Sequence, residues 1–185
     1  MLIAARQLQA DGHLAGNQVI STVMSNLGLE KALERLGISM VRTPVGDKYV
    51  LEEMLRRTAA LGGEQSGHVI FREYATTGDG MLTALKLLET SVRQKATLDE
   101  LAADLTVFPQ LLVNIRVKER KPLEQLPTVV EEIRACEAAL DGCGRVVVRF
   151  SGTEPLARVM VEAPDMNQVE TWSSRIADAI RNELA

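Results

Sequence analysis

The chain has 185 residues, 46% of them hydrophobic and 25% charged, and this ordinary composition excludes a wholly disordered protein. Its 21 basic and 25 acidic residues leave a net charge of −4, and only 3% of the residues are aromatic. Both a general binder of the nucleic-acid backbone and a groove that stacks bases or sugar rings are therefore disfavoured.

The first part of the chain alternates between helical and strand patterns. Glycines are expected to end several of the helices, among them Gly62 and Gly63 after the third helix, and Ser25 or Asn26 is expected to cap the second. In chain order, the predicted elements are a helix over 2–11, a strand over 17–23, a helix over 27–36, a strand over 38–42, a helix over 50–61, a strand over 68–71 and a helix over 81–94. This alternation predicts an α/β domain with a mixed, mostly parallel sheet.

The pattern changes near residue 95, where prolines begin to interrupt the chain. The predicted elements that follow are a helix over 98–105, a strand over 111–117, a helix over 127–140, strands over 144–150 and 156–162, and a helix over 167–184. The last two strands meet across residues 151–155 and predict a hairpin. We expect a small α+β domain with an antiparallel sheet and two helices on one face, and we divide the chain into domains at 1–107 and 108–185.

The segment Gly-Gly-Glu-Gln-Ser-Gly-His at residues 62–68 is a candidate binding segment. In an extended backbone, Glu64, Ser66 and His68 would share one side of the chain. A carboxylate and a hydroxyl two residues apart can bind neighbouring sugar hydroxyls. A helix end followed by a turn with solvated side chains is the alternative, with His68 as a structural histidine.

The segment Arg-Phe-Ser-Gly-Thr-Glu-Pro at residues 149–155 places a hydroxyl-rich glycine turn at the end of a strand. Backbone N–H groups, two hydroxyls and a guanidinium suit a phosphate monoester. Arg158 lies on the following strand and could reach the same anion. An ordinary hairpin turn with a surface arginine is the alternative.

Two further loops precede helices. Residues 76–80 could form a phosphate nest, but capping of the next helix by Thr77 or Asp79 is favoured. Asp47 and Lys48 follow a strand, where binding residues of α/β sheets collect, although Asp47 could simply be an N-cap.

Nothing in the sequence predicts a membrane or secreted protein. No apolar run approaches the roughly 20 residues that cross a bilayer, and the first residues lack the regions of a signal peptide. Cys136 and Cys143 are too few for a disulfide framework, and we expect both to be reduced in a cytoplasmic protein, although their pairing stays open. Two cysteines and two scattered histidines lack the ligand spacing of a zinc site.

The strings at 62–68, 76–80 and 149–155, in this order, resemble motifs of the α-D-phosphohexomutase superfamily. Val-Met-Ser-Asn-Leu-Gly at 23–28 and Val-Gly-Asp-Lys-Tyr-Val at 45–50 resemble its bacterial phosphoglucosamine mutase branch. The resemblance covers essentially the whole chain. It implies an isomerase that interconverts glucosamine 6-phosphate and glucosamine 1-phosphate through a phosphoserine and a bisphosphate intermediate, on the route to UDP-N-acetylglucosamine.

The resemblance also implies that the chain corresponds to the third and fourth of four domains. The family's phosphoryl-carrying serine lies in a Ser-His-Asn-Pro context and its magnesium loop reads Asp-Gly-Asp-x-Asp-Arg; neither string occurs here. We therefore expect Mg²⁺ to be held outside this chain, and the chain alone to be inactive. The expected partners are the glucosamine phosphate and the N-terminal half, with self-association through the exposed surface of the third domain that faces the second domain of the family.

The resemblance assigns substrate recognition to both domains. Residues 1–107 would bind the sugar, with Glu64 and Ser66 matching the family's pair for sugar hydroxyls, and His68, Asp47 and Lys48 facing the same cleft. An orienting or proton-transfer role for His68 is implied only as an option.

Residues 108–185 would bind the non-reacting phosphate. The implied phosphate ligands are Arg149, Ser151, Gly152, Thr153 and, with a weaker match, Arg158. Phe150 stands where the family usually has proline, which implies a less preorganised loop. A free-standing sugar-phosphate binding module and a purely structural pair of domains are the alternatives.

Overall fold

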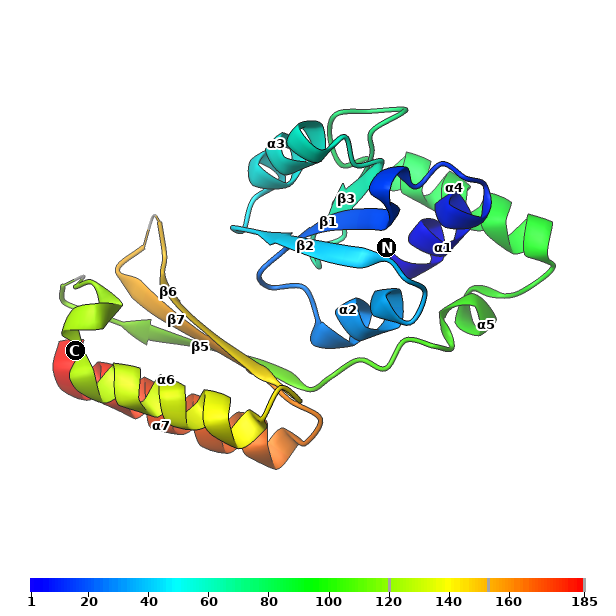
Figure 1. Cartoon of the computed structure of the whole chain (residues 1–185). Helices are drawn as coiled ribbons and strands as arrows, with labels where there is room; N and C mark the ends of the chain where they lie inside the picture. Colours follow the sequence, from blue (N-terminus) through cyan, green and yellow to red (C-terminus); the bar gives the residue numbers. More distant parts are fainter. Residues whose placement is uncertain (120, 153, 185) are drawn as a thin grey trace. The chain divides into compact units, whose positions relative to one another are not determined.

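The computed structural model describes residues 1–119, 121–152 and 154–184 and divides into two compact units, Met1–Val107 and Phe108–Ala185. Figure 1 shows the course of the chain through both units. Within the described residues, no helix is both long enough and apolar enough to cross a membrane. Thr153, one of the expected phosphate ligands, lies outside the described residues.

The first unit is an α/β fold around a four-stranded sheet. Its elements are α1 (Leu2–Ala10), η1 (Ala15–Asn17), β1 (Gln18–Thr22), α2 (Leu27–Glu34), β2 (Ser39–Thr43), α3 (Asp47–Arg57), β3 (Leu61–Gly63), β4 (Val69–Phe71), α4 (Gly80–Gln94) and α5 (Leu98–Ala102). The strand order is β2-β1-β3-β4, with β1 parallel to both neighbours and β4 antiparallel to β3. The predicted mixed, mostly parallel sheet is confirmed.

Successive residues of the strands supply two separate cores, because side chains alternate across a sheet. Val19 of β1 packs in the cluster that includes α1 and α2 residues, whereas Ile20 packs with Val50 and Met54 of α3. Helices therefore cover both faces of this sheet, as Figure 1 shows.

Gly62 and Gly63 do not stop the third helix, so that prediction is wrong. Helix α3 ends at Arg57, where Thr58 adopts a left-handed conformation with φ 57°. The two glycines form β3 instead. A Cβ atom on Gly62 would lie 2.4 Å from Sδ of Met54, and one on Gly63 would lie 2.5 Å from the carbonyl oxygen of His68. Glycine is needed here for close packing of the strand rather than for a turn.

The second unit is an antiparallel sheet with two helices. Its elements are β5 (Gln110–Arg116), η2 (Leu123–Gln125), α6 (Pro127–Leu140), β6 (Arg145–Phe150), β7 (Leu156–Glu162) and α7 (Met166–Leu184), with strand order β5-β7-β6. Helices α6 and α7 lie side by side on one face of the sheet (Figure 1). The predicted antiparallel sheet, the hairpin of its last two strands and the α+β class are confirmed.

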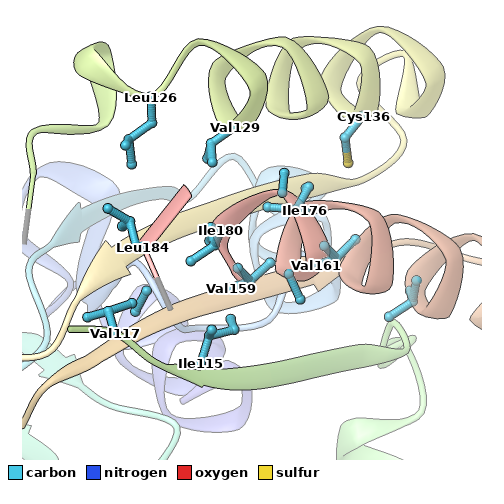
Figure 2. Packing of buried hydrophobic residues seen from close by; sticks show 14 of the residues in the cluster. Ile115, Val117, Leu126, Val129, Cys136, Val159, Val161, Ile176, Ile180 and Leu184 are labelled. Carbon is cyan, nitrogen blue, oxygen red and sulfur yellow. The ribbon is translucent and has the colours of Figure 1, made fainter. Parts of the chain in front are cut away.

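One continuous core joins the sheet of the second unit to its helices (Figure 2). Val159 and Val161 of β7 point toward Ile176 and Ile180 of α7, and Cys136 of α6 lies beside them in the same cluster. Both cysteines are free; Cys136 is buried and Cys143 exposed. The opposite face of the sheet is therefore the one that carries the polar side chains of the strands, among them Arg149 and Arg158.

Candidate functional site

The candidate sugar-binding residues of the first unit follow the carboxyl ends of parallel strands. Strands β1, β2 and β3 run in the same direction, so the segments after them begin at the same edge of the sheet. Glu64 directly follows β3, and Asp47 and Lys48 begin the helix after β2. The topology thus places these three residues at the edge where binding sites of such sheets lie.

Glu64 opens a tight turn rather than an extended segment. Its N–H donates to the carbonyl oxygen of His68 over 2.8 Å, and the N–H of Gly67 donates to the carbonyl oxygen of Glu64 over 3.2 Å. Gly67 has φ +95°, a conformation that favours glycine. The backbone of this segment is therefore not extended, as a shared side for Glu64, Ser66 and His68 would have required. Ser66 Oγ nevertheless lies 3.3 Å from Nδ1 of His68. Antiparallel pairing of β3 with β4 explains the turn, since a hairpin must reverse the chain.

The side chains of this turn are available to a ligand. Glu64 is half-buried, and Ser66 and His68 are exposed. In the described part of the chain, the Glu64 carboxylate has no hydrogen-bond or ion-pair partner. A carboxylate beside a hydroxyl can accept hydrogen bonds from two adjacent sugar hydroxyls while the hydroxyl donates or accepts.

A network of polar side chains from β1, β2 and the segment after β1, which the sequence did not predict, stabilises this turn. Ser21 Oγ donates to the carbonyl oxygen of Gly63 over 2.8 Å and is hydrogen-bonded to Ser25 Oγ. Nη1 of Arg42 donates to the carbonyl oxygens of Thr22 and Ser25 over 3.1 and 2.7 Å. The Ser21 bond fixes the carbonyl that precedes Glu64, and the Arg42 bonds hold the segment that follows β1. Their only signal in the sequence is a pair of hydroxyl residues at the end of a strand.

The same network continues to the side chains around it. Nη2 of Arg42 pairs with Glu30 at 2.7 Å, and Thr22 Oγ1 donates to Oε1 of Gln65, within the turn, over 3.2 Å. The position of the turn is therefore set by β1 and β2 as well as by its own hydrogen bonds.

Asp47 does not cap helix α3, so the N-cap alternative is wrong. Gly46 occupies that position with φ 135°, and Asp47 is the first helical residue. Its carboxylate accepts from the N–H of Lys48 over 2.9 Å. Lys48 is exposed and lies 3.8 Å from Oε1 of Glu52. Both side chains stay accessible at the sheet edge.

Capping by Asp79 of the helix after residues 76–80 is confirmed. Asp79 Oδ1 accepts from the N–H of Leu82 over 3.0 Å. A carboxylate at this helix N-terminus occupies the place that a phosphate would take, and its charge disfavours a second anion there. The segment also packs against the turn, because a Cβ atom on Gly78 would lie 2.9 Å from Cδ2 of His68.

The candidate phosphate site of the second unit contains two arginines on neighbouring strands. Arg149 of β6 is directly opposite Arg158 of β7, and Asn114 of β5 continues the row. Like charges directly opposite each other are unfavourable in a sheet. Arg158 is paired with Glu154 at 2.7 Å, whereas Arg149 has no ion-pair partner in the described part of the chain.

Burial makes the excess positive charge of these two arginines less favourable. The Nε atoms of Arg149 and Arg158 are buried and have no hydrogen-bond partner among the described residues. Burial, and secondly the charge of Arg158, lower the pKa of Arg149. The desolvated guanidinium of Arg149, which has no ion-pair partner in the described part of the chain, favours an anion because the anion would supply both the missing charge and the missing acceptors.

The hairpin turn uses some of its own donors. The N–H of Ser151 donates to the carbonyl oxygen of Leu156 over 2.8 Å, and Ser151 Oγ accepts from the N–H of Glu154 over 3.3 Å. Gly152 is exposed, with nothing within 4 Å of a Cβ atom placed on it. Among the residues of this turn that the structure describes, the Ser151 hydroxyl proton and the Gly152 N–H remain as donors for a ligand.

Two further residues, Phe150 and Arg116, lie near this turn. Phe150 lies at the end of β6, and its side chain packs against the core of the second unit. Arg116, which sequence reasoning missed, ends β5 opposite Leu156 on the same face as Asn114. Arg116 and Pro155 line a groove of about 490 Å³ beside the turn. The alternation of polar residues along β5 was the available signal.

The described residues contain no group of three or more His, Cys, Asp or Glu side chains arranged to hold a metal ion.

Two known domain families match the chain in succession. Residues 1–108 match the alpha/beta/alpha domain III of phosphoglucomutase/phosphomannomutase. Residues 112–179 match the C-terminal domain of the same family.

Curated relatives align with the whole chain. The phosphoglucosamine mutase of Solibacter usitatus (strain Ellin6076) is 66% identical over 184 residues, covering 100% of this chain and 41% of the relative. That of Koribacter versatilis (strain Ellin345) is 52% identical over 185 residues, covering 100% of this chain and 40% of the relative. The chain therefore spans about two-fifths of the length of these relatives.

Solved structures share the fold. An N-acetylglucosamine-phosphate mutase of the α-D-phosphohexomutase superfamily, in its substrate complex, has a TM-score of 0.78 at 23% identity, covering 97% of this chain and 42% of that one. The N-acetylphosphoglucosamine mutase of Aspergillus fumigatus, in complex with GlcNAc-6P and magnesium, has a TM-score of 0.77 at 22% identity, covering 98% and 42%. Because its two units match consecutive domains, the chain belongs to the phosphoglucomutase/phosphomannomutase family, of which it contains domain III and the C-terminal domain.

Proposed function

We propose that this chain is the substrate-recognition part of a phosphoglucosamine mutase, which interconverts glucosamine 6-phosphate and glucosamine 1-phosphate. The first unit binds sugar hydroxyls through Glu64 and Ser66, with His68, Asp47 and Lys48 at the same sheet edge. The second unit binds the phosphate that does not react. The names of the curated relatives support this substrate. The Glu64 carboxylate, which has no partner among the residues that the structure describes, supports the sugar role.

The observation that carries the proposal is a pair of opposed arginines in the second unit, whose positive charge exceeds that of the carboxylate beside them. Arg149 and Arg158 face each other across two strands, and Arg149 has no ion-pair partner in the described part of the chain. The planar guanidinium forms two parallel hydrogen bonds to phosphate oxygens. Ser151, Gly152 and Thr153 of the turn complete the proposed site.

The phosphoryl transfer itself is assigned to residues outside this chain. In the proposed whole enzyme, a phosphoserine carries the group through a bisphosphate intermediate, and Mg²⁺, when bound by its own loop, supplies charge neutralisation. This chain's residues orient the sugar by its hydroxyls and hold the distal phosphate. A phosphate clamp that is independent of the reacting end suits this reaction, because either phosphate of the intermediate must be able to occupy it.

We also propose that the chain works in the cytoplasm and together with other protein chains. Its two free cysteines suit the reducing conditions of the cytoplasm. Its partners are the remainder of the enzyme and a second copy of itself, which would bind the surface of the first unit that faces the family's second domain.

Calorimetric titration with inorganic phosphate tests the arginine site. We expect Arg149→Ala to weaken phosphate binding by about 1.5–3 kcal/mol, the range for hydrogen bonds to charged groups. Arg181→Ala, which removes an exposed arginine of α7 paired with Asp178, is the matched control and should bind phosphate like the parent. Equal affinities of the parent and Arg149→Ala would reduce the motif to an ordinary turn.

A further inference from the structure

The side chain of Gln65 connects two strands of the first unit. Gln65 lies in the turn that follows β3, and its Oε1 accepts a hydrogen bond over 3.2 Å from Oγ1 of Thr22, the last residue of β1. Strand β1 lies between β3 and β2 in the sheet. The bond therefore places the Gln65 amide at the end of β1, between the strand that leads to Glu64 and the strand that leads to Asp47 and Lys48.

The burial of Thr22 determines which way the Gln65 amide is turned. Thr22 is fully buried, and its Oγ1 accepts from the N–H of Met24 over 3.3 Å. A buried hydroxyl also needs an acceptor for its own proton. In the described part of the chain, the acceptor in contact with it is Oε1 of Gln65. The Gln65 oxygen therefore faces Thr22, and both N–H donors of the amide point away from it.

These two donors are unused within the described part of the chain. Gln65 is exposed, and its amide nitrogen has no hydrogen-bond partner among the described residues. The carboxylate of the preceding residue, Glu64, is likewise without a partner there. Consecutive residues of the turn thus present donors and acceptors, on a backbone that Ser21 holds through the carbonyl oxygen of Gly63.

We propose that Gln65 is a further sugar-binding residue, oriented by Thr22, whose amide donates to the oxygen of the same hydroxyl group that donates to Glu64. This inference rests on the proposed function and adds a ligand to the same site. A sugar hydroxyl donates one hydrogen bond and accepts others, so a single hydroxyl satisfies both residues. Hydrogen bonds in such a chain polarise and strengthen one another.

The pair of Glu64 and Gln65 selects a neutral hydroxyl over an ammonium group. An ammonium group donates hydrogen bonds but accepts none, so it would satisfy Glu64 and leave the Gln65 donors facing a positive charge. A phosphate group accepts hydrogen bonds but is repelled by Glu64. The amino group of glucosamine 6-phosphate therefore lies away from this pair, which contacts a hydroxyl that glucose 6-phosphate has as well.

Calorimetric titration of the whole chain with glucosamine 6-phosphate, glucose 6-phosphate and inorganic phosphate tests the proposal. Gln65→Met keeps the length of the side chain but has no amide. It should weaken the binding of both sugar phosphates by about three- to tenfold, the range for a neutral hydrogen bond. Binding of inorganic phosphate, which the proposed function assigns to the second unit, should not change.

Variants of Thr22 test the orientation of the amide. Thr22→Val keeps the shape of the side chain but removes the hydroxyl, so it should weaken sugar-phosphate binding, whereas Thr22→Ser retains the hydroxyl and should bind like the parent. The double variant Thr22→Val/Gln65→Met should bind no more weakly than Gln65→Met alone, because Thr22 acts through Gln65. Thr90→Val is the matched control and should bind like the parent. It removes another buried threonine hydroxyl of the same unit, one that donates to the carbonyl oxygen of Lys86 within α4.

Each outcome bears on a different part of the proposal, once circular dichroism has shown that the variants fold. If Gln65→Met binds both sugar phosphates like the parent, this inference is wrong and the proposed function stands; if the parent binds neither sugar phosphate, both are wrong. A loss confined to glucosamine 6-phosphate would mean that Gln65 contacts the amino group and would overturn the assigned hydroxyl. Equal losses in Thr22→Val and Thr90→Val would overturn the orienting role of Thr22.

Discussion

In the proposed division of roles, the Glu64 carboxylate separates sugar binding from phosphate binding. It accepts hydrogen bonds but repels anions, and it has no partner in the described part of the chain. Ser66 and His68 are near it in the same turn. Recognition of sugar and of phosphate should therefore be separable by mutation.

We expect Glu64→Gln to lower the affinity for glucosamine 6-phosphate by about 1.5–3 kcal/mol, since hydrogen bonds to a charged acceptor are lost. Affinity for inorganic phosphate should stay unchanged. Calorimetry with both ligands measures the difference, and Glu73→Gln, an exposed glutamate after β4, is the control. A parallel loss for both ligands would mean that the variant disturbs the fold rather than a sugar contact.

The pH dependence of stability tests whether the Cys136 thiol is buried in the core of the second unit. Burial is the largest of the causes that raise the pKa of its thiol, to about 11 from 9.0. Above pH 9 the unfolded chain loses this proton while the folded chain retains it, so the free energy of unfolding should fall as pH rises toward 11. The full contribution is on the order of 1–3 kcal/mol.

Urea unfolding on both sides of this pH window measures the effect. Cys136→Ala should be less stable at neutral pH but should lose less stability than the parent as pH rises. Cys143→Ala, at an exposed position, should follow the parent. Identical pH dependence of the parent and Cys136→Ala would contradict a buried, neutral thiol.

At the scale of elements, β3 is the piece on which the sugar-binding turn depends. It is only three residues long, yet it pairs with β1 on one side and β4 on the other. Its glycines allow that pairing because a side chain at Gly63 would meet backbone atoms of His68. Backbone atoms cannot move aside as the end of a flexible side chain can.

We therefore expect Gly63→Ala to lower the free energy of unfolding by about 1–3 kcal/mol, as overpacking does. Gly80→Ala is the matched control, because nothing lies within 4 Å of its added Cβ atom. That control should be neutral or up to about 1 kcal/mol more stable, since alanine restricts the unfolded chain. Chemical denaturation of both variants compares them; a harmless Gly63→Ala would mean that β3 can shift away from β4.

The sequence predicted most elements because local signals and packing agreed in them. The 127–140 helix and the 156–162 strand have the predicted bounds, and Asn26 and Asp79 cap helices as their side chains suggest. Strand β3 was missed because glycine serves both as a helix stop and as a residue for close packing, and only the tertiary partners distinguish the two.

The sequence predicted the residues of the candidate site but not the hydrogen bonds that hold the site in place. Glu64 and Arg149 stand in recognisable strings, whereas Ser21 and Arg42 act on the site through carbonyl oxygens that no sequence pattern marks. Arg116 and Asn114 enter only through the register of β5 with β7. The assignment of Glu64 and Arg149 as ligands stays a prediction.

At the scale of the whole molecule, the chain is two units with different proposed tasks, and it spans about two-fifths of the length of the two curated relatives described above. Recognition without a phosphoryl carrier leaves the chemical barrier in place, since positioning needs a nucleophile to position. The central claim is thus that this chain binds its sugar phosphate without converting it.

Phosphorus NMR of glucosamine 6-phosphate in the presence of the chain and Mg²⁺ tests this claim most directly. We expect the 6-phosphate resonance to shift or broaden as the chain is added, the effect to be lost in Arg149→Ala, and no 1-phosphate resonance to appear. A resonance that the chain leaves unchanged, or a growing 1-phosphate signal from the purified chain, would contradict the account.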